Sequence, residues 1–221
     1  MKKALLFISV AVLLCNCNDE KKATPASETT NVTTGTEAIA KDSLLITDSS
    51  WGVITETTGF DELVTIFGTA NVKDETICGP ECIDSIRITK VFPDSPKEII
   101  IHWKDSLYHK SIRLIESDQQ EAPYYSSYKI KRKTSLKELL AINGRKINFM
   151  GFGWDYGGYI QSYNDGKLAN SKIRYRLECL NSQNKSLYGD YELATDMPDV
   201  EAELDNIFVS QLSLSFIIET P

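Results

Sequence analysis

Residues 151–159 read Gly-Phe-Gly-Trp-Asp-Tyr-Gly-Gly-Tyr, a glycine-rich stretch of the kind that can hold a nucleotide. A dinucleotide loop needs Gly-x-Gly-x-x-Gly between a strand and a helix, so that amides at the helix start meet the pyrophosphate. Here the third glycine, Gly157, comes one residue late, and residues 159–163 alternate like a strand. The pattern therefore predicts no nucleotide site, and we expect no cofactor.

The same stretch fits two other interpretations. In the first, a strand bends at Gly151 and Gly153 and returns through a turn at Gly157 and Gly158, with aromatic rings lying over bare backbone. In the second, the rings form a surface that binds a partner. Tyr and Trp suit this role because they offer a large contact area and lose the freedom of only a few rotatable bonds on binding. All ten tyrosines lie between Tyr108 and Tyr191. The predicted binding residues are Tyr124, Tyr125, Trp154, Tyr156 and Tyr159.

Carboxylates are the other groups with possible chemistry. A glycoside hydrolase would pair Asp155 with a second acid across a cleft. Seven acidic residues fall between Asp190 and Asp205, but their spacing matches no calcium loop and Pro198 interrupts them, which predicts a solvated acidic loop. The chain contains no Gly-x-Ser-x-Gly, His-Glu-x-x-His or P-loop motif. We predict no catalytic or metal site, with a polysaccharide hydrolase using Asp155 and an acid near Asp190 as the alternative.

The first 17 residues carry an export signal. Lys2 and Lys3 precede an apolar run, residues 4–14, that is too short to span a bilayer. Leu14 lies three residues before Cys17, and this stretch resembles the lipobox of bacterial lipoproteins. The resemblance implies lipidation of Cys17, with Cys15 as the alternative, and two or more acyl chains anchor a protein stably. We therefore expect a palmitate-bearing lipoprotein of the cell outer membrane, facing either the periplasm or the cell surface.

Residues 18–49 are rich in Thr, Ser, Ala and Glu and nearly free of aromatics. Such a segment buries too little apolar area to offset the entropy of ordering it, so it is predicted to be a flexible tether. About 170 residues follow, enough for one medium domain or two small ones. The formal net charge of −7 argues against nucleic acid and against electrostatic binding to anionic lipid. The expected partners are the membrane, through the lipid anchor, and an envelope protein or glycan.

Three cysteines and both histidines remain to be assigned. Cys78 and Cys82 flank Gly79-Pro80, and a turn there would bring their sulfurs together, which favours a disulfide in an exported protein. Cys179 continues the apolar face of residues 173–179, so it is predicted to be a buried free thiol. His102 and His109 neighbour no nucleophile motif and are predicted to be solvated on the surface.

An internal repeat gives the clearest structural signal. Residues 54–68 and 130–144 align with an offset of 76. The matched pairs are Ile54 and Ile130, Thr58 and Thr134, Glu62 and Glu138, Leu63 and Leu139, Ile66 and Ile142, and Gly68 and Gly144. The apolar spacing predicts a short amphipathic helix in each segment, N-capped by Thr58 and by Thr134 or Ser135 and ended by the glycine. Glu138, three residues after Ser135, predicts a capping box.

Alternating or β-branched runs follow each helix and predict antiparallel strands. They cover residues 83–92, 98–104 and 110–116 in the first half, and 146–150, 159–163, 173–179, 188–192 and 207–218 in the second. The predicted fold class is α+β, with two similar repeats, residues 50–125 and 126–221, each a short helix followed by an antiparallel β-meander. This plan resembles the tandem repeats of the β-lactamase-inhibitory-protein-like fold and of small outer-membrane assembly lipoproteins.

These observations together predict a lipid-anchored cell-envelope protein without catalytic activity. The tandem plan and the concentration of tyrosines favour a binding or inhibitor-like module for another protein or an envelope glycan. The pattern of Asn143-Gly144 followed by the 151–158 stretch is similar to an uncharacterised family of exported bacterial proteins, which implies no activity.

Overall fold

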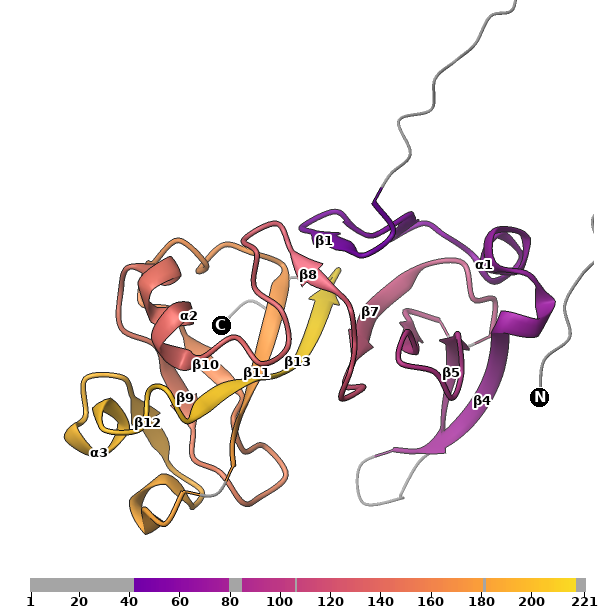
Figure 1. Cartoon of the computed structure of the whole chain (residues 1–221). Helices are drawn as coiled ribbons and strands as arrows, with labels where there is room; N and C mark the ends of the chain where they lie inside the picture. Colours follow the sequence, from indigo (N-terminus) through magenta and orange to yellow (C-terminus); the bar gives the residue numbers. More distant parts are fainter. Residues whose placement is uncertain (1–41, 80–84, 106, 181, 218–221) are drawn as a thin grey trace, which may run out of the picture. The chain divides into compact units, whose positions relative to one another are not determined.

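A computed structural model describes residues 42–79, 85–105, 107–180 and 182–217 (Figure 1). All of the described residues belong to one compact unit, Ile39–Pro221. The predicted signal with Cys15 and Cys17, most of the predicted tether, and Cys82 lie outside the described residues. Within the described ranges, no helix is both long and apolar enough to cross a membrane.

The fold is mixed α+β, with mostly antiparallel sheets and few helices. The largest sheet has six strands in the order β11-β13-β7-β6-β5-β4. These strands are β4 (Val72–Cys78), β5 (Ser85–Val91), β6 (Ile99–Trp103), β7 (Ile112–Ser117), β11 (Ile173–Cys179) and β13 (Ile207–Ser215). Strands β4 to β7 form a meander, and β13 pairs antiparallel with β7, with Leu214 opposite Ile115. One sheet therefore contains strands from both halves of the sequence.

Two smaller sheets flank the large one. The first has the order β3-β2-β1-β8, formed by β1 (Leu45–Thr47), β2 (Ser50–Trp51), β3 (Ile54–Thr55) and β8 (Tyr125–Ser126), and its β1–β8 pair is parallel. The second has the order β10-β9-β12, formed by β9 (Asn148–Met150), β10 (Ile160–Ser162) and β12 (Glu192–Ala194). A single antiparallel bridge between Tyr159 and Arg176 links this sheet to β11.

The two main helices lie where the sequence predicts them. Helix α1 (Phe60–Phe67) contacts β4 and β5, and α2 (Leu136–Asn143) contacts β13 (Figure 1). Gly68 and Gly144 follow the helices with φ of 83° and 72°, and each N–H bonds the carbonyl four residues back. Glycine adopts such angles at little cost, so the predicted helix ends are confirmed. A shorter helix, α3 (Pro198–Glu201), and the 3-10 turns η1 (Thr69–Asn71) and η3 (Lys185–Leu187) are the other helical elements within the described residues.

The helix starts differ from each other. The capping box predicted at Ser135 and Glu138 is confirmed, because each side chain bonds the backbone N–H of the other. Thr58 does not cap α1, since Gly59 is the residue before that helix. The Thr58 hydroxyl instead accepts from the N–H of Thr55 at 3.0 Å. Thr134 accepts from the N–H of Lys131 at the same distance, so both threonines close a turn just before a helix.

One buried cluster lies beneath the helices and the sheets. It includes Leu63 of α1, Leu139 of α2 and the inward residues of the strands. Ile46 of β1 is fully buried in this cluster, although it lies within residues 18–49. The predicted tether therefore extends too far, and the folded unit begins before residue 50. A mostly polar segment is ordered here because its few apolar residues reach a core supplied by the rest of the chain.

Replacing Ser135 by Ala is expected to destabilise the protein by about 1 kcal/mol, because the N–H of Glu138 loses its acceptor at the start of α2. The free energy of unfolding, measured in urea, checks this value. Ser135→Asp is the matched control, since Asp is an equally good N-cap and should keep most of the stability. Equal losses in the two variants would contradict a capping role.

Buried tyrosines are expected to make the protein sensitive to alkali. Burial raises the pKa of Tyr124 to about 12, and it also raises the pKa of Tyr163 and of Tyr175. A tyrosine whose pKa is higher in the folded state than in the unfolded state contributes to the stability of the fold. This contribution is complete below pH ~10, the pKa of a free phenol, and is lost as pH rises through the folded pKa. Tyrosinate absorbance followed together with circular dichroism should show these phenols ionising only as the protein unfolds. Ionisation of all phenols near pH ~10 with the fold intact would contradict this expectation.

Candidate functional site

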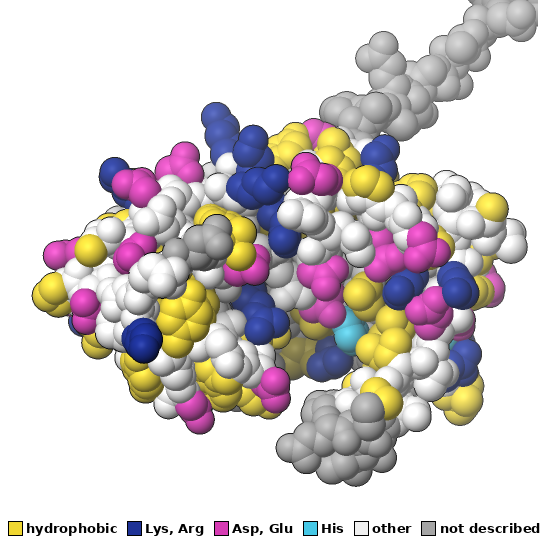
Figure 2. Space-filling model, turned by 60° about the horizontal axis from the view of Figure 1, so that its bottom comes forward, with side chains coloured by type: hydrophobic (Ala, Val, Ile, Leu, Met, Phe, Trp, Pro, Cys, Tyr) yellow, Lys and Arg dark blue, Asp and Glu magenta, His cyan; other side chains and the backbone are white. Residues whose placement is uncertain are grey.

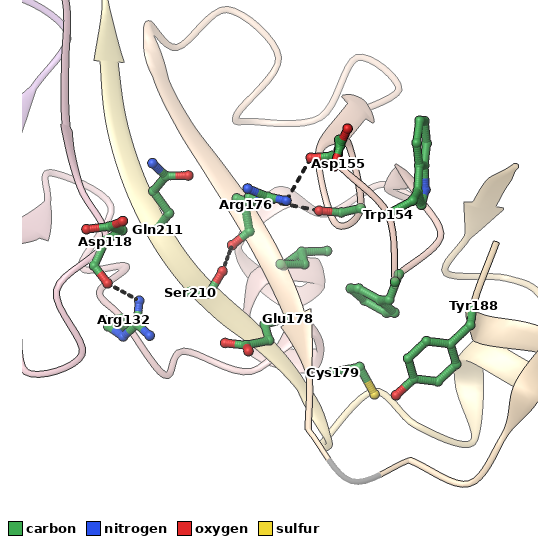
Figure 3. Close-up of a pocket in the computed structure, with 14 residues that line it drawn as sticks. Asp118, Arg132, Trp154, Asp155, Arg176, Glu178, Cys179, Tyr188, Ser210 and Gln211 are labelled. Atoms are coloured by element: carbon green, nitrogen blue, oxygen red, sulfur yellow. Dashed lines mark hydrogen bonds between the residues drawn. The ribbon is translucent and has the colours of Figure 1, made fainter. Parts of the chain in front are cut away.

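A groove of about 660 Å³ lies over the outer face of β11 and β13 (Figure 3). The residues that line it are Asp118, Arg132, Phe152, Gly153, Trp154, Asp155, Gly157, Arg176, Leu177, Glu178, Cys179, Tyr188, Ser210 and Gln211. The face of the molecule seen in Figure 2 is hollowed in its middle, where acidic, basic and hydrophobic side chains meet. The lining of the groove itself combines acidic, basic, aromatic and thiol side chains.

Strand alternation decides which side chains reach the groove. Along β11, Tyr175, Leu177 and Cys179 are buried, whereas Arg176 and Glu178 alternate with them and are partly exposed. Arg176 is paired with Gln211 of β13, so the two side chains share the outer face. A bulge follows at once, because Leu177 pairs with Val209 and leaves Ser210 as the extra residue. Cys179 is the buried free thiol that the sequence predicts.

Arg176 holds the loop between β9 and β10 against the sheet. Its Nε donates to the carbonyl of Gly157 at 2.8 Å, and its Nη2 donates to the carbonyl of Asp155 at 3.0 Å (Figure 3). The same guanidinium lies 4.6 Å from the centre of the Tyr159 ring, within the range of a cation–π interaction. A rigid strand residue therefore fixes both the backbone and one ring of the loop.

Glycines allow this loop to lie on the neighbouring backbone. Gly153 and Gly158 have φ of 87° and 77°, angles that other residues rarely adopt. A Cβ at Gly158 would overlap the carbonyl of Leu177, and one at Gly151 would lie 2.6 Å from the carbonyl oxygen of Gly189. The predicted bend at Gly153 and the predicted turn at Gly157 and Gly158 are confirmed, whereas no bend occurs at Gly151. The stretch is a strand-to-strand connection, as its spacing predicts.

Three of the predicted binding residues meet on this loop. The Trp154 and Tyr156 rings are 5.3 Å apart, and the Tyr156 and Tyr159 rings are 6.3 Å apart. Tyr156 is 61% exposed and Tyr159 41% exposed, while Trp154 is partly buried and donates from Nε1 to the carbonyl of Gly151. We call Trp154, Tyr156 and Tyr159 the aromatic rim. Its rings are ordered yet solvent-facing, which is the condition for a contact surface.

The other two predicted binding residues do not belong to the rim. Tyr124 is only 3% exposed, packs edge-on against Trp51 and donates its hydroxyl to the carbonyl of Lys97. Its expected place on an exposed surface was wrong, because the ring completes the core beneath β2. Tyr125 is partly exposed, but its hydroxyl donates to the carboxylate of Asp42, and it does not line the groove.

Sequence reasoning missed Tyr188, which lines the groove beside Phe152 and Gly153. Its ring centre lies 6.2 Å from that of Phe152, and the side chain is 38% exposed. Its hydroxyl points at the sulfur of Cys179, a thiol whose pKa burial raises (Figure 3). Residues 188–191, Tyr-Gly-Asp-Tyr, resemble residues 156–159, Tyr-Gly-Gly-Tyr, and this similarity was the signal in the sequence.

The groove contains charges of both signs. Asp118, Asp155 and Glu178 line it together with Arg132 and Arg176. Across the described ranges, the salt bridges are formed by other side chains. The acids from Asp190 to Asp205 do not line the groove, so the pair that the hydrolase alternative needs, Asp155 with an acid near Asp190, does not meet there. In the part of the chain that the structure describes, no three acidic, His or Cys side chains are placed to hold a metal.

Both histidines differ from their expected solvated state. His109 is buried, its ring is stacked on Trp103 at 4.8 Å, and its Nδ1 lies 3.4 Å from Asp74. His102 lies on the outer face of β6 with little of its side chain exposed, and its Nε2 is 2.8 Å from Glu116. Polar partners on neighbouring strands let both rings leave water, which a lone histidine in a sequence does not reveal.

The cysteine prediction is described only in part. Cys78 ends β4 and forms a disulfide. Cys82, its predicted partner, is outside the described residues, so the pairing stays a prediction.

Comparison with known proteins identifies no family. No family model and no curated protein matches the chain. A solved structure that it resembles is that of the uncharacterized protein yfeY from Escherichia coli, with 13% sequence identity and a TM-score of 0.45. The match covers 77% of this chain and 98% of that chain. It gives no activity or ligand for this protein.

Gly158→Ala is expected to destabilise the protein by about 3 kcal/mol, because a Cβ adds a clash with the Leu177 carbonyl to an unfavourable φ. Gly144→Ala is the matched control, since φ is also positive there but the site is open, and it should cost about 1 kcal/mol. Denaturant unfolding of both variants measures the difference. Similar costs would show that the loop can move away from β11.

Proposed function

We propose that this protein is a lipid-anchored cell-envelope module that binds another protein through the groove and the aromatic rim, without catalysis. The observation that carries the proposal is that Arg176 holds a loop with two well-exposed tyrosines in one conformation above a groove. Large rings that are already ordered gain contact area on binding while losing little conformational entropy. They are therefore suited to anchor an interface.

The composition of the two loops beside the groove supports a protein partner. Residues 151–159 and 182–191 are rich in Gly, Tyr, Ser and Asn, the residue types that antibody paratopes use. The aromatic residues of such surfaces are the usual hot spots, and neighbouring polar groups supply adaptable hydrogen bonds. A neutral glycan would stack on the rings but leave the charges of Arg132, Asp118 and Glu178 without partners. These unpaired charges favour a protein surface that carries charges of its own.

We further propose that the folded unit consists of two similar repeats. Helix α1 and α2, the glycines that end them, and the threonine turns that precede them all recur at the same offset of 76 residues. Strands β4-β5-β6-β7 come after the first helix, and β9, β10, β11 and β13 come after the second, with β12 as an additional strand that pairs with β9. In the second repeat, the connection between the first two strands is the 151–159 loop. The aromatic rim would then belong to the second repeat only, whereas Asp118 brings one lining residue of the groove from the first.

The proposal of a lipid anchor is supported by the sequence alone. The export signal and the lipobox-like residues around Cys17 support attachment to the outer membrane. The polar segment after Cys17 would hold the folded unit away from the lipid surface.

Replacing Tyr156 and Tyr159 together by Ala is expected to weaken capture of the envelope partner about tenfold or more, since aromatic hot spots dominate interfaces. Tyr108→Ala is the matched control, because Tyr108 is 67% exposed but lies between β6 and β7, outside the aromatic rim. The full-length protein, purified from cross-linked envelopes, would be analysed for a stoichiometric protein partner by mass spectrometry. Equal recovery with both variants would show that the rim is not the interface.

One activity measurement distinguishes the hydrolase alternative from the binding module. Asp155 lines the groove with two other carboxylates, Asp118 and Glu178. We expect no turnover of envelope polysaccharides by the wild-type protein. Cleavage that disappears in Asp155→Asn while the fold is retained would favour the hydrolase over the binding module.

A further inference from the structure

We propose that the groove receives a Lys or Arg side chain of the partner protein, held between aromatic rings and carboxylates. The inference rests on the proposed binding function and specifies the chemistry that the partner must present. It arises from three features of the groove: the rings of Trp154 and Tyr188, the carboxylates of Asp155 and Glu178, and the excess of three carboxylates over two guanidiniums that already donate to backbone carbonyls.

The rings provide faces that attract cations. Trp154 and Tyr188 line the groove together with Phe152, whose ring centre is 6.2 Å from that of Tyr188. Trp and Tyr are the rings that bind guanidinium and ammonium groups most strongly. The rim already holds one guanidinium in this way, since Arg176 lies over the ring of Tyr159. A second cation would find the same chemistry inside the groove.

The carboxylates are available to a cation from outside. Among the described residues, neither Asp155 nor Glu178 takes part in a salt bridge. The bond from Arg176 to Asp155 ends on the backbone carbonyl and leaves the side chain unused. Glu178 lines the groove and is partly exposed. A cation between such groups makes charge-assisted hydrogen bonds as well as ring contacts.

The arginines are partly committed to backbone carbonyls. Arg176 uses Nε and one Nη2 hydrogen on two carbonyls of the loop, which leaves Nη1 and the second Nη2 hydrogen. Arg132 uses Nη1 on the carbonyl of Asp118, and its buried Nε has no hydrogen-bond partner among the described residues. Three carboxylates thus face two guanidiniums whose donors are partly used. The formal net charge of −7 adds long-range attraction for a basic partner.

Tryptophan fluorescence can report occupation of the groove directly. Trp51 and Trp103 are buried in the core, whereas Trp154 is partly exposed and lines the groove. The chain has three tryptophans, so a ligand that alters the emission without unfolding the protein acts through Trp154. Full-length protein in detergent would be titrated with a Gly/Ser peptide bearing two Arg residues, with the same peptide bearing citrulline, and with one bearing Glu.

The Arg peptide is expected to bind about tenfold more tightly than the citrulline peptide, which has nearly the same shape without the charge. Replacing Asp155 by Asn and Glu178 by Gln together should remove that preference. Asp165→Asn is the matched control, because Asp165 is exposed, lies outside the groove and has a φ of 56° that Asn tolerates. It should leave the preference unchanged.

Equal binding of the Arg and citrulline peptides, tighter binding of the Glu peptide, or absence of binding by all three would overturn the inference. A preference for Arg that survives in the Asp155/Glu178 variant would also overturn it. None of these results would affect capture of a protein partner through Tyr156 and Tyr159, so failure of this inference is distinguishable from failure of the proposed function.

Discussion

The pairing of β7 with β13 is the constraint on which the rest of the structure depends. Four residues of each strand are in register, from Leu212 opposite Ser117 to Ser215 opposite Leu114. This ladder joins strands of the first half to strands of the second in one sheet with one continuous core. At the same seam, Glu116 accepts from Gln211 and contacts His102, so polar groups also cross between the halves on the outer face.

That sheet positions the side chains of the candidate site. Alternation along β11 buries Leu177 and turns Arg176 outward, where its donors meet two loop carbonyls. The loop can lie there only because Gly158 has no side chain where it passes the Leu177 carbonyl. The position of the aromatic rim is therefore set by backbone sterics and one guanidinium, and the rings themselves remain free to contact a partner.

Local signals made the helices and several strands predictable. Apolar spacing, Ser135 with Glu138, and terminal glycines define α2 within its own residues, and strict alternation defines β11. Strand β4 was missed because Lys73, Asp74 and Glu75 give it the polar character of an exposed sheet edge. The burial of Ile46, Tyr124 and His109 was missed for another reason. Each depends on partners far away in sequence, such as Lys97 for Tyr124, and no local pattern records them.

The central claim is that the aromatic rim is preformed before any partner binds. Amide hydrogen exchange of Gly158 and Leu177, followed by NMR in the protein alone, tests it most directly. The N–H of Gly158 donates to the carbonyl of Met150, and the N–H of Leu177 donates to the carbonyl of Gly158. The account predicts that both amides exchange slowly, as those of the neighbouring strands do. Exchange of Gly158 at the rate of an unstructured peptide would contradict it.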